Sequence, residues 1–203
     1  MLTYMLMILL AVNPFAFGYR RATDGDIIIL VVFLSSFVIP LVSVAVSYLL
    51  GWIQSIQMPT REERIAPLLI SVVMYVSLYL HVSRANVFPM AFRVCVLGVV
   101  IALFLAFFLT IVTKVSLHGV GAGGLVSMVI LTVLYFSYDH FDLVLPGLGA
   151  FSFDKEFLLY GSILLAGLIC SARLILKAHK VQDVYGGFIA GFFSQLIAFI
   201  ILQ

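Results

Sequence analysis

The sequence predicts an all-α integral membrane protein, a helical bundle of about six to seven transmembrane helices in a single membrane-embedded domain over residues 1–203. Of the 203 residues, 64% are hydrophobic and only 10% are charged, whereas a soluble domain is nearer half apolar and a quarter charged. The apolar residues form long runs without the alternation typical of strands, and lipid offers no hydrogen-bond partner to open backbone. These observations favour helices that lie in a membrane over most of the chain.

Seven apolar segments cover most of the sequence. They are residues 2–19, 26–52, 65–82, 90–113, 119–138, 157–177 and 183–202. We interpret the first as a retained helix that spans fully or in part, because no positively charged region of a signal peptide precedes it. Pro14 is expected to disturb this first helix, and Pro40 to kink the second.

The connections are short, and only residues 139–156 are long enough to have a shape of their own. We interpret Asp139, His140 and Asp142 in that connection as part of a solvated loop. Cys95 and Cys170 lie inside apolar runs, so they are expected to be buried small hydrophobes rather than a disulfide.

If all seven segments cross, the loops 53–64, 114–118 and 178–182 share one side of the membrane. That side gathers most of the unusual chemistry of the chain: Arg61, Arg64, Lys114, His118, Lys177, His179 and Lys180, with Arg173 one or two turns below the surface. Arginines on the opposite side balance this charge, so the positive-inside rule does not orient the chain.

The stretch ARLILKAHKVQD, residues 172–183, is the strongest of three polar clusters. Arg173 lies within the last two turns of an apolar segment, where an arginine is costly without a role or a partner. If the turn is helical, His179 and Asp183 face each other at i, i+4. The carboxylate would fix the imidazole tautomer and leave the other ring nitrogen free as a nucleophile. The alternative is a basic loop with an Asp N-cap.

The second cluster is KVSLHGVGAGG, residues 114–124, with Lys114, Ser116 and His118 between two helices. The helix that begins near Gly119 points free N–H groups into this loop, which suits an anion. The glycines of the stretch let a neighbouring helix come close.

The third cluster is QMPTREERIAP, residues 57–67, in which Arg61 and Arg64 lie one turn apart if helical. One interpretation is a solvated helix start with self-neutralised charge, in which Thr60 and Glu63 form a capping box. The other is an arginine that reaches an anion.

Together the clusters suit a phosphate ester: cations hold the oxygens, one histidine attacks and the other protonates the leaving group. The histidines lack nearby carboxylates or thiols at ligand spacing, so no metal or cofactor is predicted. The formal charge of +2 and the lack of a basic tail give no indication of nucleic acid as a partner.

These residues resemble a family, the type-2 phosphatidic acid phosphatases, which share an active site with vanadium haloperoxidases. The family's third signature is Ser-Arg, five residues, His, three residues, Asp, and here Arg173, His179 and Asp183 have that spacing. The family often continues as this chain does, with Val184, Gly187 and Gly191. Its second signature, Pro-Ser-Gly-His, keeps its Ser and His in this chain as Ser116 and His118. The resemblance covers roughly residues 57–195.

The resemblance implies a role for each matched residue. His179 would form a phosphohistidine, Asp183 would orient it, and His118 would protonate the leaving oxygen. Arg173 and Ser116 would hold the phosphate. The implied substrate is a lipid phosphate or pyrophosphate, with membrane lipids as the only other partner. The implied location is a bacterial inner membrane, with the site on its extracytoplasmic face.

The chain departs from the family at the first signature, Lys, six residues, Arg-Pro. If Arg64 is that Arg, Gln57 replaces the Lys and Ile65 the Pro; Arg61 or Lys114 could supply the missing charge. Ala172 also replaces the usual Ser before the Arg. An inactive member that binds lipid phosphates or acts as a partner subunit is therefore the alternative, and a transporter is a third interpretation.

Overall fold

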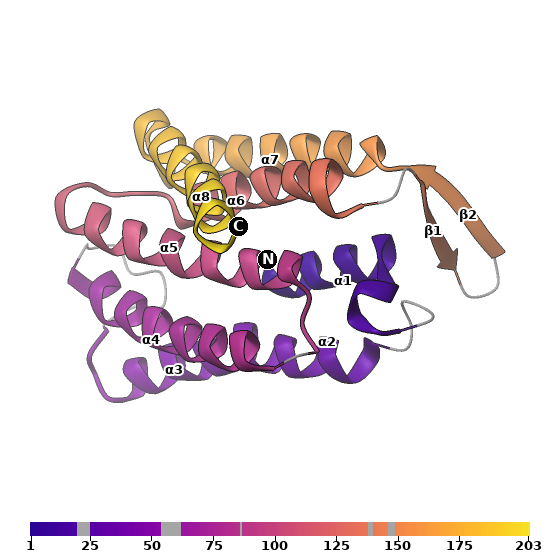
Figure 1. Ribbon diagram of the computed structural model, residues 1–203. Coiled ribbons are helices and arrows are strands. Elements are labelled where there is room, and N and C mark those ends of the chain that lie inside the picture. Colours follow the sequence, from indigo (N-terminus) through magenta and orange to yellow (C-terminus); the bar gives the residue numbers. More distant parts are fainter. Residues whose placement is uncertain (20–24, 54–61, 86, 138–139, 146–148) are drawn as a thin grey trace.

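The computed structural model describes residues 1–19, 25–53, 62–85, 87–137, 140–145 and 149–203. Its helices are α1 (Leu2–Val12), α2 (Asp26–Phe33), α3 (Ile39–Leu49), α4 (Glu62–Arg84), α5 (Met90–Val112), α6 (Leu117–Leu131), α7 (Glu156–Ile175) and α8 (Val181–Leu202) (Figure 1). Its strands are β1 (His140–Leu145) and β2 (Gly149–Asp154).

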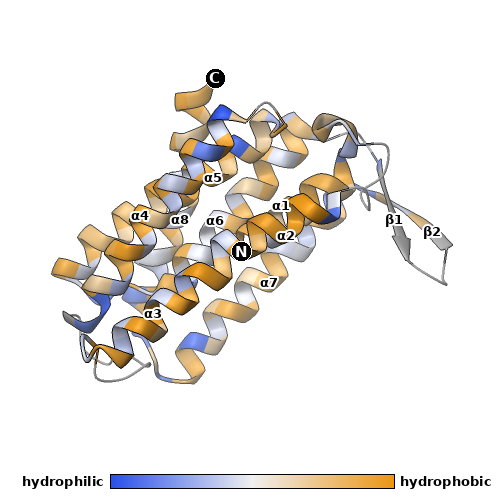
Figure 2. Ribbon diagram, turned by 90° about the horizontal axis from the view of Figure 1, so that it is seen from below, coloured by the Kyte–Doolittle hydropathy of each residue, from blue (hydrophilic) through white to orange (hydrophobic). Residues whose placement is uncertain are grey.

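Within the described ranges, six helical stretches are long and apolar enough to cross a membrane. They are Asp26–Leu49, Glu63–Arg84, Met90–Val112, Leu117–Phe136, Glu156–Ile175 and Val181–Leu202. A helix needs about 20 apolar residues to cross the hydrocarbon core, and the most hydrophilic parts of the chain lie mainly toward the helix ends (Figure 2). The predicted helical bundle is confirmed, with helices that are long and apolar enough to span a membrane.

The prediction of one helix over residues 2–19 is wrong. The helix α1 ends at Val12, and Pro14 begins a short 3-10 turn that ends at Phe17. The Asn13 side chain caps this turn, because its Oδ1 accepts a hydrogen bond from the Ala16 N–H at 3.1 Å. At 11 residues, α1 is too short to span, and it packs within the bundle against α2 and α5.

Pro40 disturbs the second segment as expected, through a π-helical stretch, Leu34–Val38, between α2 and α3. A proline has no N–H, so it cannot donate to the carbonyl four residues earlier, that of Ser36. The Tyr75 hydroxyl of α4 donates to this Ser36 oxygen at 2.8 Å instead. A backbone group released by the proline thereby joins two neighbouring helices.

Part of the connection 139–156 is an antiparallel β-hairpin rather than a loop, so the fold is not purely helical. Strands β1 and β2 pair from His140 opposite Asp154 to Leu145 opposite Gly149, with Asp142 opposite Ser152. His140 Nδ1 lies 2.7 Å from Asp154 Oδ1, and both side chains are more than half exposed. Asp139 lies outside the described residues.

The closest contact between two long helices joins α6 to α8 through glycines. A β-carbon added at Gly123 of α6 would overlap the Phe188 carbonyl oxygen, and one added at Gly191 of α8 would overlap that of Val120. The two backbones therefore touch directly, as small residues allow in membrane helices. The expectation that the glycines after Lys114 admit a neighbouring helix is confirmed.

The same contact continues to the ends of both helices, where it fixes two loops against each other. A β-carbon at Gly187 would meet the Ser116 carbonyl oxygen, and one at Gly119 would meet that of Val184. The Ser116 N–H also donates to the Asp183 carbonyl at 3.1 Å. Two clusters that are far apart in sequence are thus joined through the backbone.

Candidate functional site

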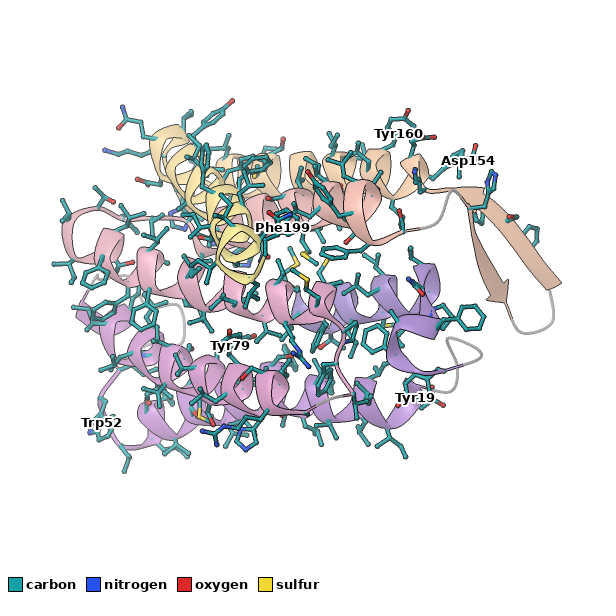
Figure 3. The ribbon with its side chains drawn as sticks, in the orientation of Figure 1. Tyr19, Trp52, Tyr79, Asp154, Tyr160 and Phe199 are labelled. Atoms are coloured by element: carbon teal, nitrogen blue, oxygen red, sulfur yellow. The ribbon has the colours of Figure 1, made fainter. Side chains whose placement is uncertain are left out.

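The described residues of the three polar clusters lie at one end of the bundle. The end of α5, the start of α6, the end of α7 and the start of α8 lie at the left of Figure 1, with the end of α3 and the start of α4 at the same end. Trp52, 64% exposed, marks this end in Figure 3, whereas Tyr19 and Asp154 lie at the opposite end. An exposed Trp at a helix end is typical of the membrane–water interface.

A tight turn after α7 determines the position of His179. Lys177 has φ 52°, the left-handed conformation that favours glycine, and here it is adopted by a side-chain-bearing residue at a cost of roughly 1–2 kcal/mol. The Ala178 N–H donates to the Arg173 carbonyl at 3.2 Å, and the Lys177 N–H to that of Leu174 at 3.0 Å. This Schellman motif ends α7, and His179 follows two residues after the left-handed residue.

His179 and Asp183 face each other, although not within one helix as expected. Helix α8 begins only at Val181, so the pair forms across its capping turn. The distance from His179 Nδ1 to Asp183 Oδ2 is 3.8 Å, and the side chains are 5% and 16% exposed. That distance is too long for a hydrogen bond. The same Oδ2 accepts the Lys180 N–H at 2.9 Å, so Asp183 also caps α8.

Positive charge surrounds the His179 imidazole. Burial lowers the pKa of His179, the charges of Arg64 and Arg173 lower it further, Asp183 raises it, and Lys114 lowers it again. Because such interactions weaken with distance, they indicate that cations from α4, α7 and the α5–α6 connection surround one side chain. A neutral imidazole among cations is the state that a nucleophile requires.

Arg173 lies in the last turn of α7 and presents a buried donor. Its Nε and the Nδ1 of His179 are both buried, and neither has a hydrogen-bond partner among the described residues. Arg173 also interacts electrostatically with His118 and Arg64. Buried donors are nearly always satisfied in folded proteins, so the Nε–H of Arg173 is suited to an anion that would bind to it.

Ser116 and His118 lie at the start of α6, against this cluster. Ser116 is fully buried and is the N-cap of α6, since its Oγ accepts the Gly119 N–H at 3.3 Å. Its hydroxyl hydrogen remains available to donate. His118 lies in the first turn of α6 with an exposed side chain, which suits exchange of a proton with a bound group.

The structure therefore brings together most of the predicted site. One neighbourhood contains these predicted site residues: Arg173, His179, Asp183, Ser116, His118, Arg64 and Lys114. Arg61 and Gln57 lie outside the described residues, so their predicted roles stay predictions. Within the described parts of the chain, the His, Cys, Asp and Glu side chains form no group of three or more that could hold a metal ion.

Sequence reasoning missed the left-handed Lys177 and the backbone bond between Ser116 and Asp183. No residue type signals the first, because glycine is the usual residue at that position. The second follows from the paired glycines of α6 and α8, which were recognised only as a sign of close packing.

No family model matches the chain, and comparisons with curated proteins and with solved structures also find no match.

Proposed function

We propose that this protein is an integral membrane phosphatase that hydrolyses a lipid phosphate or pyrophosphate monoester through a phosphohistidine. One observation carries the proposal: the buried Nε of Arg173 has no hydrogen-bond partner among the described residues, and the Arg173 charge interacts with His179. Arginine is the side chain best suited to a phosphate, because its fork of donors matches the phosphate oxygens.

In the proposed first step, Nε2 of His179 attacks phosphorus and the bond to the leaving oxygen breaks. His118 gives its proton to that oxygen. The leaving group is the lipid alcohol when the substrate is a monophosphate, and the lipid monophosphate when the substrate is a pyrophosphate. Asp183 accepts the Nδ1–H of the phosphorylated imidazole. The present Nδ1–Oδ2 distance of 3.8 Å has to shorten, which is usual when a site closes on its substrate.

In the second step, water attacks the phosphohistidine, His118 takes the proton of that water, and the phosphate leaves with His179 restored. Arg173, Arg64 and Lys114 stabilise the charge that spreads over the phosphoryl oxygens. Arg61 is proposed to join them, and the Ser116 hydroxyl is proposed to donate to one oxygen. Neither step as written requires a metal or another cofactor.

A lipid is the substrate class that suits the location of the site. The cluster lies at the ends of helices that are apolar along their length, so a lipid's phosphate can reach the cations while its chain stays in an apolar environment. A polyprenyl phosphate or a glycerolipid phosphate meets this description. The proposed membrane is the bacterial inner one, with the site on the extracytoplasmic face.

A lipid-phosphate binder without turnover is the second candidate, and one observation favours it. The carboxylate of Asp183 already accepts the Lys180 N–H, and it is not within hydrogen-bond distance of His179. In this alternative the cations bind the headgroup, and Asp183 only caps α8. A transporter has less support, because few of the described ionisable groups lie away from the ends of the helices.

Phosphate release from purified protein distinguishes the two candidates. We would measure inorganic phosphate with lipid mono- and pyrophosphates, with chelator present, for wild type, His179→Ala and His140→Ala. The phosphatase proposal expects release that His179→Ala abolishes. His140→Ala should leave it unchanged, because that histidine is exposed in the hairpin. If folded wild type releases nothing from any lipid but still binds them, the binder is correct.

A further inference from the structure

An apolar cavity, partly open to the outside, lies among the helices, and the residues of the cation cluster do not line it. Its volume is about 270 Å³, and its walls come from α1, α4, α5, α6 and α8. An apolar cavity of about 150 Å³, engineered in another protein, stays dry and binds benzene. The cavity here, which we call the tail cavity, therefore has room for a larger apolar group.

The tail cavity begins next to the candidate site. Leu117 lines it, and this residue stands between Ser116 and His118 in the chain. Met128 also lines it, 11 residues further along α6, which corresponds to about 16 Å at the rise of an α-helix. The cavity thus follows α6 from the level of the site to about the middle of a bilayer whose apolar core is about 30 Å thick.

Glycines and one polar side chain shape this space. Gly121 and Gly124 lie along its α6 wall, where side chains would otherwise fill it. A β-carbon at Gly121 would meet only the Met1 side chain, at 3.5 Å. Gln195 of α8 contributes to the wall, and its Oε1 is buried without a hydrogen-bond partner among the described residues.

We propose that the tail cavity binds the apolar chain of the lipid whose phosphate binds at His179. This inference rests on the proposed function and specifies its substrate class: a lipid phosphate with a narrow, flexible chain that enters the protein rather than remaining among the surrounding lipids. Protein interiors are packed as densely as organic crystals, so an empty space of this size loses packing contacts that a chain restores.

Chain length should then control affinity over the depth of the cavity. Each methylene that leaves water for an apolar site improves binding by up to about fourfold. Affinity for water-soluble alkyl phosphates should rise steadily with chain length until the chain reaches the level of Met128, and then rise less.

Gly121→Leu tests the inference, with Gly161→Leu as its matched control. The new side chain at position 121 fills the cavity without meeting backbone, whereas Gly161 of α7 has no atom within 4 Å of an added β-carbon. Both variants place the same residue in a membrane helix. The probe is an alkyl phosphate of about 12 carbons with a photoreactive diazirine at its chain end, followed by mass spectrometric mapping of the labelled residues.

The expected result is labelling of cavity residues such as Met128, Cys95 and Val99 in wild type and in Gly161→Leu. In Gly121→Leu, the labelling of these cavity residues should be at least tenfold lower. Labelling confined to outward-facing residues such as Phe193 and Ile197, or labelling that Gly121→Leu does not reduce, overturns the inference.

The same proteins separate this inference from the proposed function. Phosphate release by wild type without labelling of the cavity would support the phosphatase proposal and contradict the proposal that the tail cavity binds the lipid chain. Labelling of the cavity without phosphate release from any lipid would contradict the phosphatase proposal. The tail cavity would then be the site at which a lipid-binding protein holds the lipid chain.

Discussion

Substitution of Gly123 by alanine should separate α6 from α8 and so disrupt the candidate site. The added β-carbon would overlap the Phe188 carbonyl oxygen, which belongs to backbone and cannot rotate away. Overpacking of this kind costs typically 1–3 kcal/mol, against about 1 kcal/mol gained when alanine replaces glycine in a helix. We expect a net loss of up to about 2 kcal/mol, and more if the helices cannot move.

Gly124→Ala, one residue along the same helix, is the control. Its β-carbon would lie 3.6 Å from the Gly191 carbonyl oxygen, an ordinary contact, so the variant should be stabilised by up to about 1 kcal/mol. Thermal unfolding in detergent, followed by circular dichroism, measures both. Phosphate release should fall in Gly123→Ala, because the helix shift moves Ser116 from its bond to Asp183. Equal stabilities for the two variants would refute the direct backbone contact.

Further predictions follow from three single residues: His179, Lys177 and Gln195. Burial and neighbouring cations lower the pKa of His179, so the unfolded chain binds a proton at this position more readily than the folded chain does. The free energy of unfolding should therefore fall as pH drops below about 6.5. When unfolding is measured against pH, this fall should be smaller in His179→Gln. For the same reason phosphate release should persist below pH 6.5, and an acidic limb at or above that pH would contradict the lowered pKa. Lys177→Gly removes the strain of the left-handed φ and should raise stability by about 1 kcal/mol, as a higher midpoint of thermal unfolding. Gln195→Met removes an Oε1 that has no hydrogen-bond partner among the described residues, together with a long 3.4 Å bond from Nε2 to the Cys95 carbonyl. The variant should be neutral or stabilising by about 1 kcal/mol in the same assay, whereas a loss above about 2 kcal/mol would show that Oε1 is satisfied in the membrane.

The long helices could be predicted from sequence because lipid imposes a simple rule on them. About 20 apolar residues in a row have few alternatives to a helix, and six such stretches are helical. The N-terminal helix was predicted too long because hydropathy continues past Pro14, although the disturbance expected at this proline is confirmed. The hairpin was missed, although Phe151, Ser152 and Phe153 alternate in polarity. An alternation over three residues predicts a strand only weakly, compared with the long apolar runs that predict the neighbouring helices.

The site was predictable where spacing along the chain determines proximity, and less so where a turn does. Arg173, His179 and Asp183 lie within 11 residues, so any tight connection brings them together. The actual contact depends on a left-handed Lys177 and on capping of α8 by Asp183, which spacing alone does not reveal. Ser116 reaches Asp183 only because glycines on two distant helices match.

Detection of phosphate on His179 tests the central claim most directly. Purified protein would be mixed with a lipid phosphate, stopped in alkali within milliseconds to seconds, since phosphohistidine survives alkali, and its peptides analysed by mass spectrometry. The account predicts a transient mass increase of one phosphoryl group on the peptide that contains His179, absent from His179→Ala and longer lived in His118→Ala. Phosphate release with no phosphorylated His179 at any time, or with the phosphoryl group on another residue, would contradict it.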